Sequence, residues 1–74
     1  MMGSIIDRIV PIAMELGHPF TAREMCEQLY GECDHRHMVN THNKINRLCE
    51  QGYVREKERI RVGSQYKVFF EVIL

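Results

Sequence analysis

The chain has 74 residues, of which 45% are hydrophobic and 27% are charged, and its ten Lys and Arg residues balance ten Asp and Glu residues. Such a chain forms one domain over residues 1–74 and buries about 60% of its unfolded surface, too little for a deep cleft between two lobes. We therefore expect no enzyme activity, no cofactor and no small-molecule substrate. Because no apolar run approaches the roughly 18 residues of a membrane helix and residues 1–4 lack a basic signal start, we expect a soluble, cytoplasmic protein without membrane contact.

The charges are divided unevenly along the chain. Residues 1–34 carry two positive and six negative side chains, whereas residues 35–74 carry eight positive and four negative ones. This asymmetry suggests that the C-terminal part faces a polyanion and that the N-terminal part faces solvent or a protein partner. A chance division of charge in a small protein is the competing interpretation.

The spacing of apolar residues predicts a first helix over residues 5–16. Ser4 can cap this helix and Gly17 can end it, while Pro11 removes one backbone hydrogen bond from its interior. Four apolar residues share one helical face and are expected in the core: Ile5, Ile9, Ile12 and Leu16.

The second helix should begin at Thr21 and end before Gly31. Thr21 and Glu24 have the spacing of a capping box, and Phe20 and Met25 are placed as a hydrophobic staple around it. Gly31 can adopt the left-handed conformation that ends a helix.

The third helix should cover about residues 35–51. Asp34 can cap it, and Gly52 can end it with Tyr53 placed for a Schellman motif that reaches back toward Leu48. Its apolar face is formed by Met38, Thr41, Ile45 and Leu48.

Residues 53–74 change from the helical period to the period of two that is typical of strands, and they predict a β-hairpin. A two-residue turn at residues 63–64 would place Ile60 opposite Lys67 and mix apolar with charged side chains on one face. We therefore expect a loop of three or five residues, with Ile60 opposite Val68 or Tyr66.

This order of elements resembles the winged helix-turn-helix family. The resemblance covers nearly the whole chain and depends on residues 21–25 at the start of the second helix, on residues 45–54 at the end of the third, and on the charged hairpin. It implies an α+β fold of three helices followed by a two-stranded antiparallel wing, with the third helix in the major groove and the wing on the backbone or an adjacent groove. It also implies a short strand at residues 18–20 that pairs with the wing.

The solvent face of the helix over 35–51 is the first candidate DNA-binding surface. Asn can bind adenine, Arg can bind guanine, and Lys or Arg can bind phosphate. An ordinary solvated face is the alternative, although Asn residues inside a helix oppose helix propensity. The candidate residues lie opposite the apolar face: Arg36, Asn40, Asn43, Lys44 and Arg47.

The predicted wing carries the second candidate surface. Strand alternation places four basic residues on one face of its first strand, with Glu56 and Glu58 on the other face. Such a row suits phosphates or a minor groove, and the alternative is an edge strand charged against aggregation. The candidates here are Arg55, Lys57, Arg59 and Arg61, with Lys67 on the second strand.

The cysteines and histidines include metal-binding residue types but lack paired C-x-x-C or H-x₃-H spacing, so we expect no metal site. We expect Cys49 in the core, Cys26 half-buried, and the histidines near residues 35–42 on the surface. The three cysteines agree with a reducing compartment.

Two functions follow from these patterns. The first is a sequence-specific module for double-stranded DNA, as in a small transcriptional regulator. The second is a winged-helix adaptor that binds a protein partner and no DNA. Phe69 and Ile73 should alternate onto the outer face of the hairpin, where a homodimer could cover them.

Overall fold

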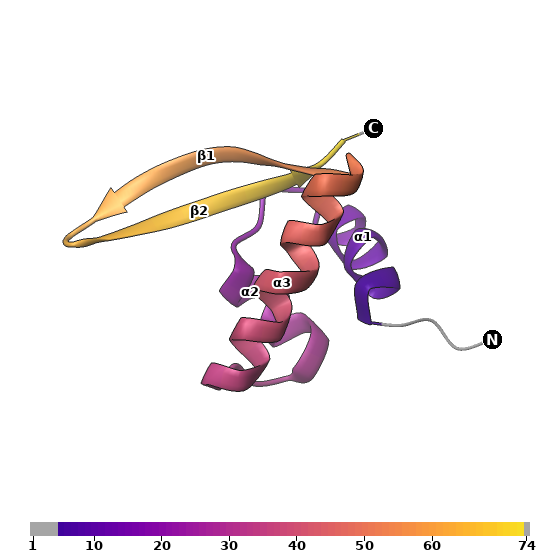
Figure 1. Ribbon diagram of the computed structural model, residues 1–74, viewed down its shortest axis with the longest axis horizontal. Coiled ribbons are helices and arrows are strands. Elements are labelled where there is room, and N and C mark those ends of the chain that lie inside the picture. The colour runs from indigo at the N-terminus through magenta and orange to yellow at the C-terminus, as the bar shows by residue number, and fades with distance from the viewer. Residues whose placement is uncertain (1–4, 74) are drawn as a thin grey trace.

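The computed structural model describes residues 5–73. It has three helices followed by a two-stranded antiparallel hairpin (Figure 1): α1 (Ile5–Leu16), α2 (Ala22–Tyr30), α3 (His35–Gln51), β1 (Val54–Val62) and β2 (Gln65–Val72). This α+β layout confirms the expected winged-helix topology, and we call the hairpin the wing. Within residues 5–73, no helix has the length and apolar character to cross a membrane. The expected cap Ser4, the side chain of Ile5 and the last hairpin residue, Leu74, lie outside the described part.

Local hydrogen bonds set the bounds of α2. The hydroxyl of Thr21 accepts a hydrogen bond from the backbone N–H of Glu24 at 3.1 Å, so the predicted cap is confirmed. The carboxylate of Glu24 lies 3.6 Å from Nε2 of His18. Gly31 ends the helix at φ 78°, a conformation that costs glycine little because it has no Cβ.

The bounds of α3 are set in the same way. Asp34 Oδ1 accepts a hydrogen bond from the backbone N–H of His37 at 2.8 Å. At the other end, the N–H of Tyr53 donates to the carbonyl of Leu48 at 3.0 Å while Gly52 lies at φ 86°, as in a Schellman motif. Both predicted ends are confirmed, and the orientation of α3 relative to the wing is therefore specified by the chain itself.

The core lies between the three helices and the base of the wing. Ile9 is fully buried as predicted, whereas Ile12 and Leu16 lie at its edge. The prediction for two cysteines is wrong: Cys26 is fully buried and Cys49 is only half-buried. The buried apolar cluster consists of Ile9, Ala13, Phe20, Ala22, Met25, Leu29, Ile45, Leu48, Val54 and Phe70.

The segment before α2 joins the wing through one pair of residues. Phe20 and Phe70 exchange two backbone hydrogen bonds of 2.9 and 2.7 Å, and their ring centres are 6.0 Å apart. The expected short strand at residues 18–20 is thus a single bridge. It attaches β2 to the helices at the point where the wing leaves the core.

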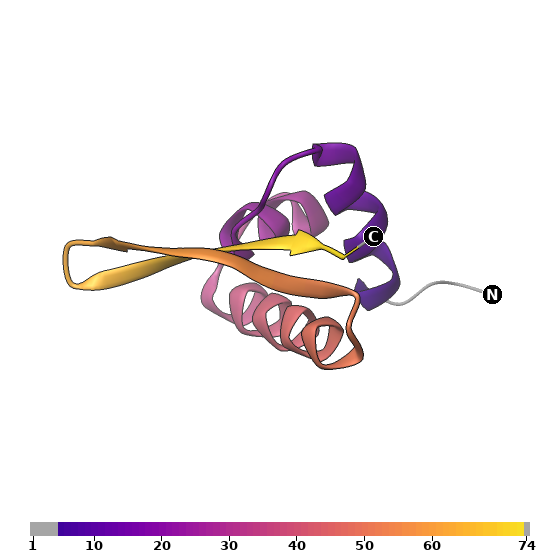
Figure 2. The ribbon, with the colours of Figure 1, turned by 90° about the horizontal axis from the view of Figure 1, so that it is seen from above.

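The turn of the wing differs from the prediction. Residues 63–64 form a two-residue turn, and Ile60 lies opposite Lys67, so the predicted pairing with Val68 or Tyr66 is wrong. The reason is that the outer half of the wing extends past the helices (Figures 1 and 2), and its side chains are exposed on both faces. No core is present there to select a register that keeps apolar residues together.

A β-bulge between Glu56 and Glu58 connects this tip with the base of the wing. At the base, Val54 lies opposite Val72, which is the pairing that the expected five-residue loop would have produced along the whole hairpin. The extra residue in β1 is Lys57. Because side chains alternate along a strand, one extra residue reverses the face on which the following side chains lie.

Candidate nucleic-acid interface

The five predicted residues of α3 share its solvent face. Arg36, Asn40, Asn43 and Arg47 are exposed and Lys44 is half-buried. The opposite face holds them in place, because Thr41, Ile45 and Leu48 are buried in the core. The hydroxyl of Thr41 donates to the carbonyl of His37 at 2.8 Å, which satisfies the one buried polar side chain of this helix.

These side chains have no partners within the described part of the chain. Hydrogen bonds and ion pairs of α3 side chains involve only His37, Met38 and Thr41 among residues 5–73. The amides of Asn40 and Asn43 and the guanidinium of Arg47 can therefore bind a ligand without first breaking a bond inside the protein.

The exposed face of α3 includes three further residues that the sequence pattern did not single out. Val39 and Asn46 flank Asn43 at helical spacing, and Glu50 lies one turn beyond Arg47. Val39 stands next to Met38 in the chain but about 100° from it around the helix axis. A helical projection would have placed it among the polar residues.

The bulge divides the predicted basic row of the wing between two faces, so the prediction of one continuous row is wrong. Arg55 lies opposite Glu71 on the face turned away from the helices, with its Nε 2.6 Å from Glu71 Oε2. Lys57 Nζ lies 3.9 Å from the other oxygen of the same carboxylate. Arg59 and Arg61 follow the bulge and lie on the opposite face.

The arginines beyond the bulge have contacts of their own. Arg59 Nη2 lies 2.9 Å from Glu56 Oε1, and its guanidinium carbon lies 5.8 Å from the ring centre of Tyr66. Glu56 was expected on the face opposite Arg59, and the bulge brings the two together. Arg61 Nε donates to the carbonyl of Gly63 at 3.1 Å.

The five basic residues of the wing therefore differ in availability. Lys67 lies on the outer face, opposite Ile60. Within residues 5–73, Arg61 and Lys67 form no ion pair, whereas the other three share two carboxylates. Surface ion pairs of this kind are worth about 0–1 kcal/mol, but they reduce the positive charge that the wing offers to a polyanion.

A group of possible metal ligands lies at the start of α3. Side-chain atoms of Glu32, Asp34 and His37 are within 4.8 Å of one another, and such carboxylate and imidazole groups can bind Zn²⁺. Asp34 Oδ1, however, caps the helix and lies 3.3 Å from His37 Nδ1, and the positive end of the helix dipole disfavours a cation here. The His37 ring is half-buried and stacks on Tyr30 at 4.1 Å, so the expectation of a surface histidine is wrong. We therefore assign Asp34 and His37 a structural role at the start of α3 and not metal binding.

The two thiols with shifted pKa values are protonated at neutral pH. Burial, followed by a hydrogen bond with Cys26, raises the pKa of Cys33 to about 11. Burial also raises the pKa of Cys49. Since the thiolate is the reactive and metal-binding form, neither thiol is activated as a nucleophile.

Asp34 makes the start of α3 sensitive to acid. The hydrogen bond from the His37 N–H holds the pKa of Asp34 below its ordinary value of 3.8. Its stabilising effect is therefore fully present above pH 3.8 and is lost as the pH falls through the lowered pKa. Asp34→Ala should reduce the urea midpoint at neutral pH and have a smaller effect well below pH 3.8. Asp34→Asn keeps a hydrogen-bond acceptor that does not titrate, so its urea midpoint should exceed that of Asp34→Ala by the same amount at both pH values. An equal effect of Asp34→Ala at both pH values would contradict this assignment.

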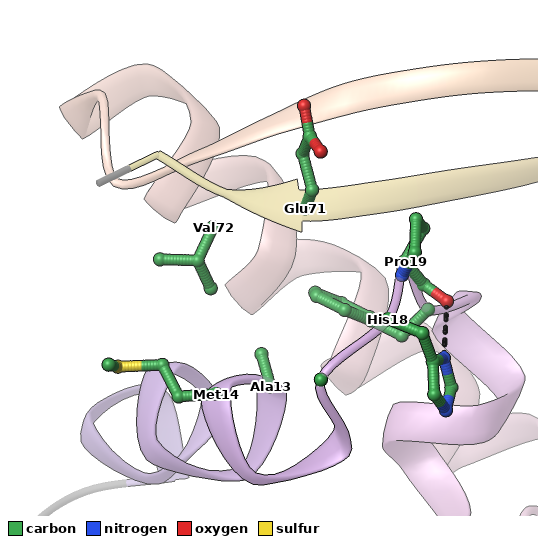
Figure 3. A pocket seen from close by; sticks show the side chains of 8 residues that line it. Ala13, Met14, His18, Pro19, Glu71 and Val72 are labelled. Carbon is green, nitrogen blue, oxygen red and sulfur yellow. Dashed lines mark hydrogen bonds between the residues drawn. The ribbon is translucent and has the colours of Figure 1, made fainter.

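A hollow of ≈ 310 Å³ lies between α1, the loop after it and β2 (Figure 3), and no residue of α3 lines it. Its polar groups are engaged elsewhere. The Glu71 carboxylate is turned toward β1, and His18 Nδ1 lies 2.8 Å from the carbonyl of Pro19. The remaining wall is mainly apolar and is formed by Ala13, Met14, Gly17, Phe20 and Val72.

Comparisons of the chain with protein-family models, with curated proteins and with solved structures give no match. The function is therefore argued from the geometry and chemistry of the surfaces described above.

Proposed function

We propose that this protein binds double-stranded DNA, with α3 in the major groove and the wing beside it, as a sequence-specific module of a small transcriptional regulator. One observation carries the proposal. The face of α3 opposite the core presents amide and guanidinium groups that have no partner among residues 5–73, and Glu50 at its far end is the only carboxylate on that face.

The dimensions and chemistry of α3 support this proposal. An α-helix with side chains is about 10–12 Å across, and the major groove is about 12 Å wide. Asn40 and Asn43 can contact base edges, while Arg36, Lys44 and Arg47 can contact guanine or phosphate. At the start of the helix, His37 donates its backbone N–H to Asp34 and stacks its ring on Tyr30, which holds the helix in place.

The wing supports the proposal through two of its five basic residues. Arg61 and Lys67, near the tip, lie on opposite faces and have no carboxylate partner in the described part of the chain. They can bind phosphates on either side of a groove. The three free thiols fit the reducing compartment, here the cytoplasm, in which such a regulator works.

The salt dependence of binding tests this function. In a fluorescence-anisotropy titration with random duplex, log affinity should fall linearly with log salt, by about 0.9 for each phosphate contact. Arg61→Gln should flatten this slope by about 0.9 and weaken binding to all sequences alike. Arg55→Gln is the matched control, since its guanidinium is paired with Glu71, and it should change the slope by less than half as much.

If the protein does not bind duplex DNA, or if its affinity does not change with salt concentration, the proposal is wrong. An unchanged slope for Arg61→Gln, with reduced solubility, would instead show that the wing residues only protect an exposed strand edge.

The second candidate function is a protein-binding adaptor or a homodimer. The observation that favours it is an apolar area at the base of the wing, where Tyr53 and Ile73 are 57% and 43% exposed and share a backbone hydrogen bond of 2.9 Å. Phe69, which was also expected on the outer face of the hairpin, is half-buried. Sedimentation of Ile73→Glu beside the wild type distinguishes the homodimer from an adaptor for another protein. A dimer held by this area should dissociate in the variant, and a monomeric wild type would exclude the homodimer.

A further inference from the structure

The exposed face of α3 carries one apolar side chain, in the first half of the helix. Val39 is 44% exposed, whereas Met38, Ile45 and Leu48 of the same helix lie in the core or pack against it. A β-branched residue is a weaker helix former than Ala or Leu, so helix propensity does not explain valine at this position. Packing within the domain does not explain its exposed methyl groups either.

Asparagine side chains lie near Val39 on this face. Asn43 is one turn farther along, Asn46 is nearly two turns farther along, and Asn40, the next residue in the chain, is turned about 100° around the helix axis. All three are exposed, and their amides form no hydrogen bonds within the described residues. Each amide offers one acceptor and two donors in a plane. The face thus presents an isopropyl group with the amide of Asn43 one turn away on one side and Arg36 about one turn away on the other, and Arg47 lies one turn beyond Asn43.

This combination matches one kind of base pair. In the major groove, adenine presents the N7 acceptor beside the N6 donor, which an asparagine amide can bind with two hydrogen bonds. Its partner thymine presents the C5-methyl group, which an isopropyl group can contact. Guanine presents two acceptors and cytosine lacks the methyl group, so a G·C pair satisfies neither requirement.

We propose that Val39 and the nearby asparagines make the exposed face of α3 select A·T base pairs, with Val39 packed against a thymine methyl group. The inference rests on the DNA-binding function proposed above and names the sequence class that this surface prefers. Residues 39–46 rise about 10 Å along the helix, which corresponds to about three base pairs. The selected segment is therefore short, and the cations at both ends of the face contact its flanks.

Replacing thymine by uracil tests the inference directly, because it removes only the methyl group. The probes are an alternating A·T duplex, the same duplex with uracil in place of thymine, and an alternating G·C duplex, each titrated by fluorescence anisotropy at one salt concentration. The wild type should bind the A·T duplex most tightly and lose about fourfold in affinity for each contacted methyl group in the uracil duplex.

Val39→Ser should remove this difference and bind the thymine and uracil duplexes equally. Val62→Ser, which changes an exposed valine at the tip of the wing, is the matched control and should keep the wild-type ratio. Both side chains are exposed, so both variants should fold, and circular dichroism checks this.

The outcomes separate the inference from the function on which it rests. Equal binding of the wild type to thymine and uracil duplexes, or a wild-type ratio in Val39→Ser, overturns the inference while DNA binding stands. Absence of binding to all three duplexes overturns the proposed function itself.

Discussion

Phe20→Ala should lower the free energy of unfolding by about 3–5 kcal/mol, the largest effect expected from a single substitution in this domain. Phe20 is fully buried, and its ring packs against Phe70 where the wing meets the helices. A chain of this length is stabilised by about 4–11 kcal/mol in total, so this loss is a large fraction of its stability. Urea denaturation followed by circular dichroism measures the loss.

Phe69→Ala is the matched control for this prediction. Phe69 is the neighbour of Phe70 on the opposite face of β2 and is half-buried, so its truncation should cost less than about 2 kcal/mol. Equal losses for Phe20→Ala and Phe69→Ala would show that the bridge between residue 20 and the wing does not hold the core together.

On the DNA side, Asn43→Ala and Arg47→Ala should each cost about 1–3 kcal/mol in binding to the best sequence selected from random duplexes, which is about 5-fold to 150-fold in affinity. The reason is that base-edge contacts by an amide or guanidinium depend on sequence. The loss on random duplex should be much smaller. Stability should barely change, since both side chains are exposed and leave no cavity.

The matched controls lie on α2. Gln28→Ala and Arg23→Ala remove an amide and a guanidinium from exposed positions outside the α3 face, and they should leave the preference among sequences unchanged. If Asn43→Ala and Arg47→Ala weaken binding to the selected and random duplexes equally, α3 contacts phosphates only, and the proposal of sequence-specific contact by α3 is wrong.

The bounds of the helices could be predicted from the sequence because they depend on interactions over a few residues. Thr21 and Asp34 cap helices through bonds to N–H groups three residues away, and Gly52 ends α3 through a left-handed turn that joins Tyr53 to Leu48. The exposed face of α3 could be predicted for the same reason. Helical period alone places Asn43 and Arg47 opposite Ile45 and its buried neighbours.

Burial of single side chains depended on long-range packing. Cys26, in the middle of α2, is fully buried, and Cys49, near the end of α3, is half-buried, which their local patterns do not distinguish. The stacking of His37 on Tyr30 likewise joins two helices, and nothing in the spacing of these residues indicates it.

By itself, the sequence determined three helices, their ends, a hairpin and the residues that α3 exposes, since all of these follow from local hydrogen bonds and from the periods of helix and strand. Only the tertiary structure decided the register of the wing. Its base is held by the core and by the bridge to Phe20, its tip is held by the turn at residues 63–64, and the two registers differ by one residue. The bulge at Lys57 absorbs that difference and places Arg59 and Arg61 on the face opposite Arg55. An alternating pattern cannot reveal such a reversal, because it assumes that every residue of the strand is paired.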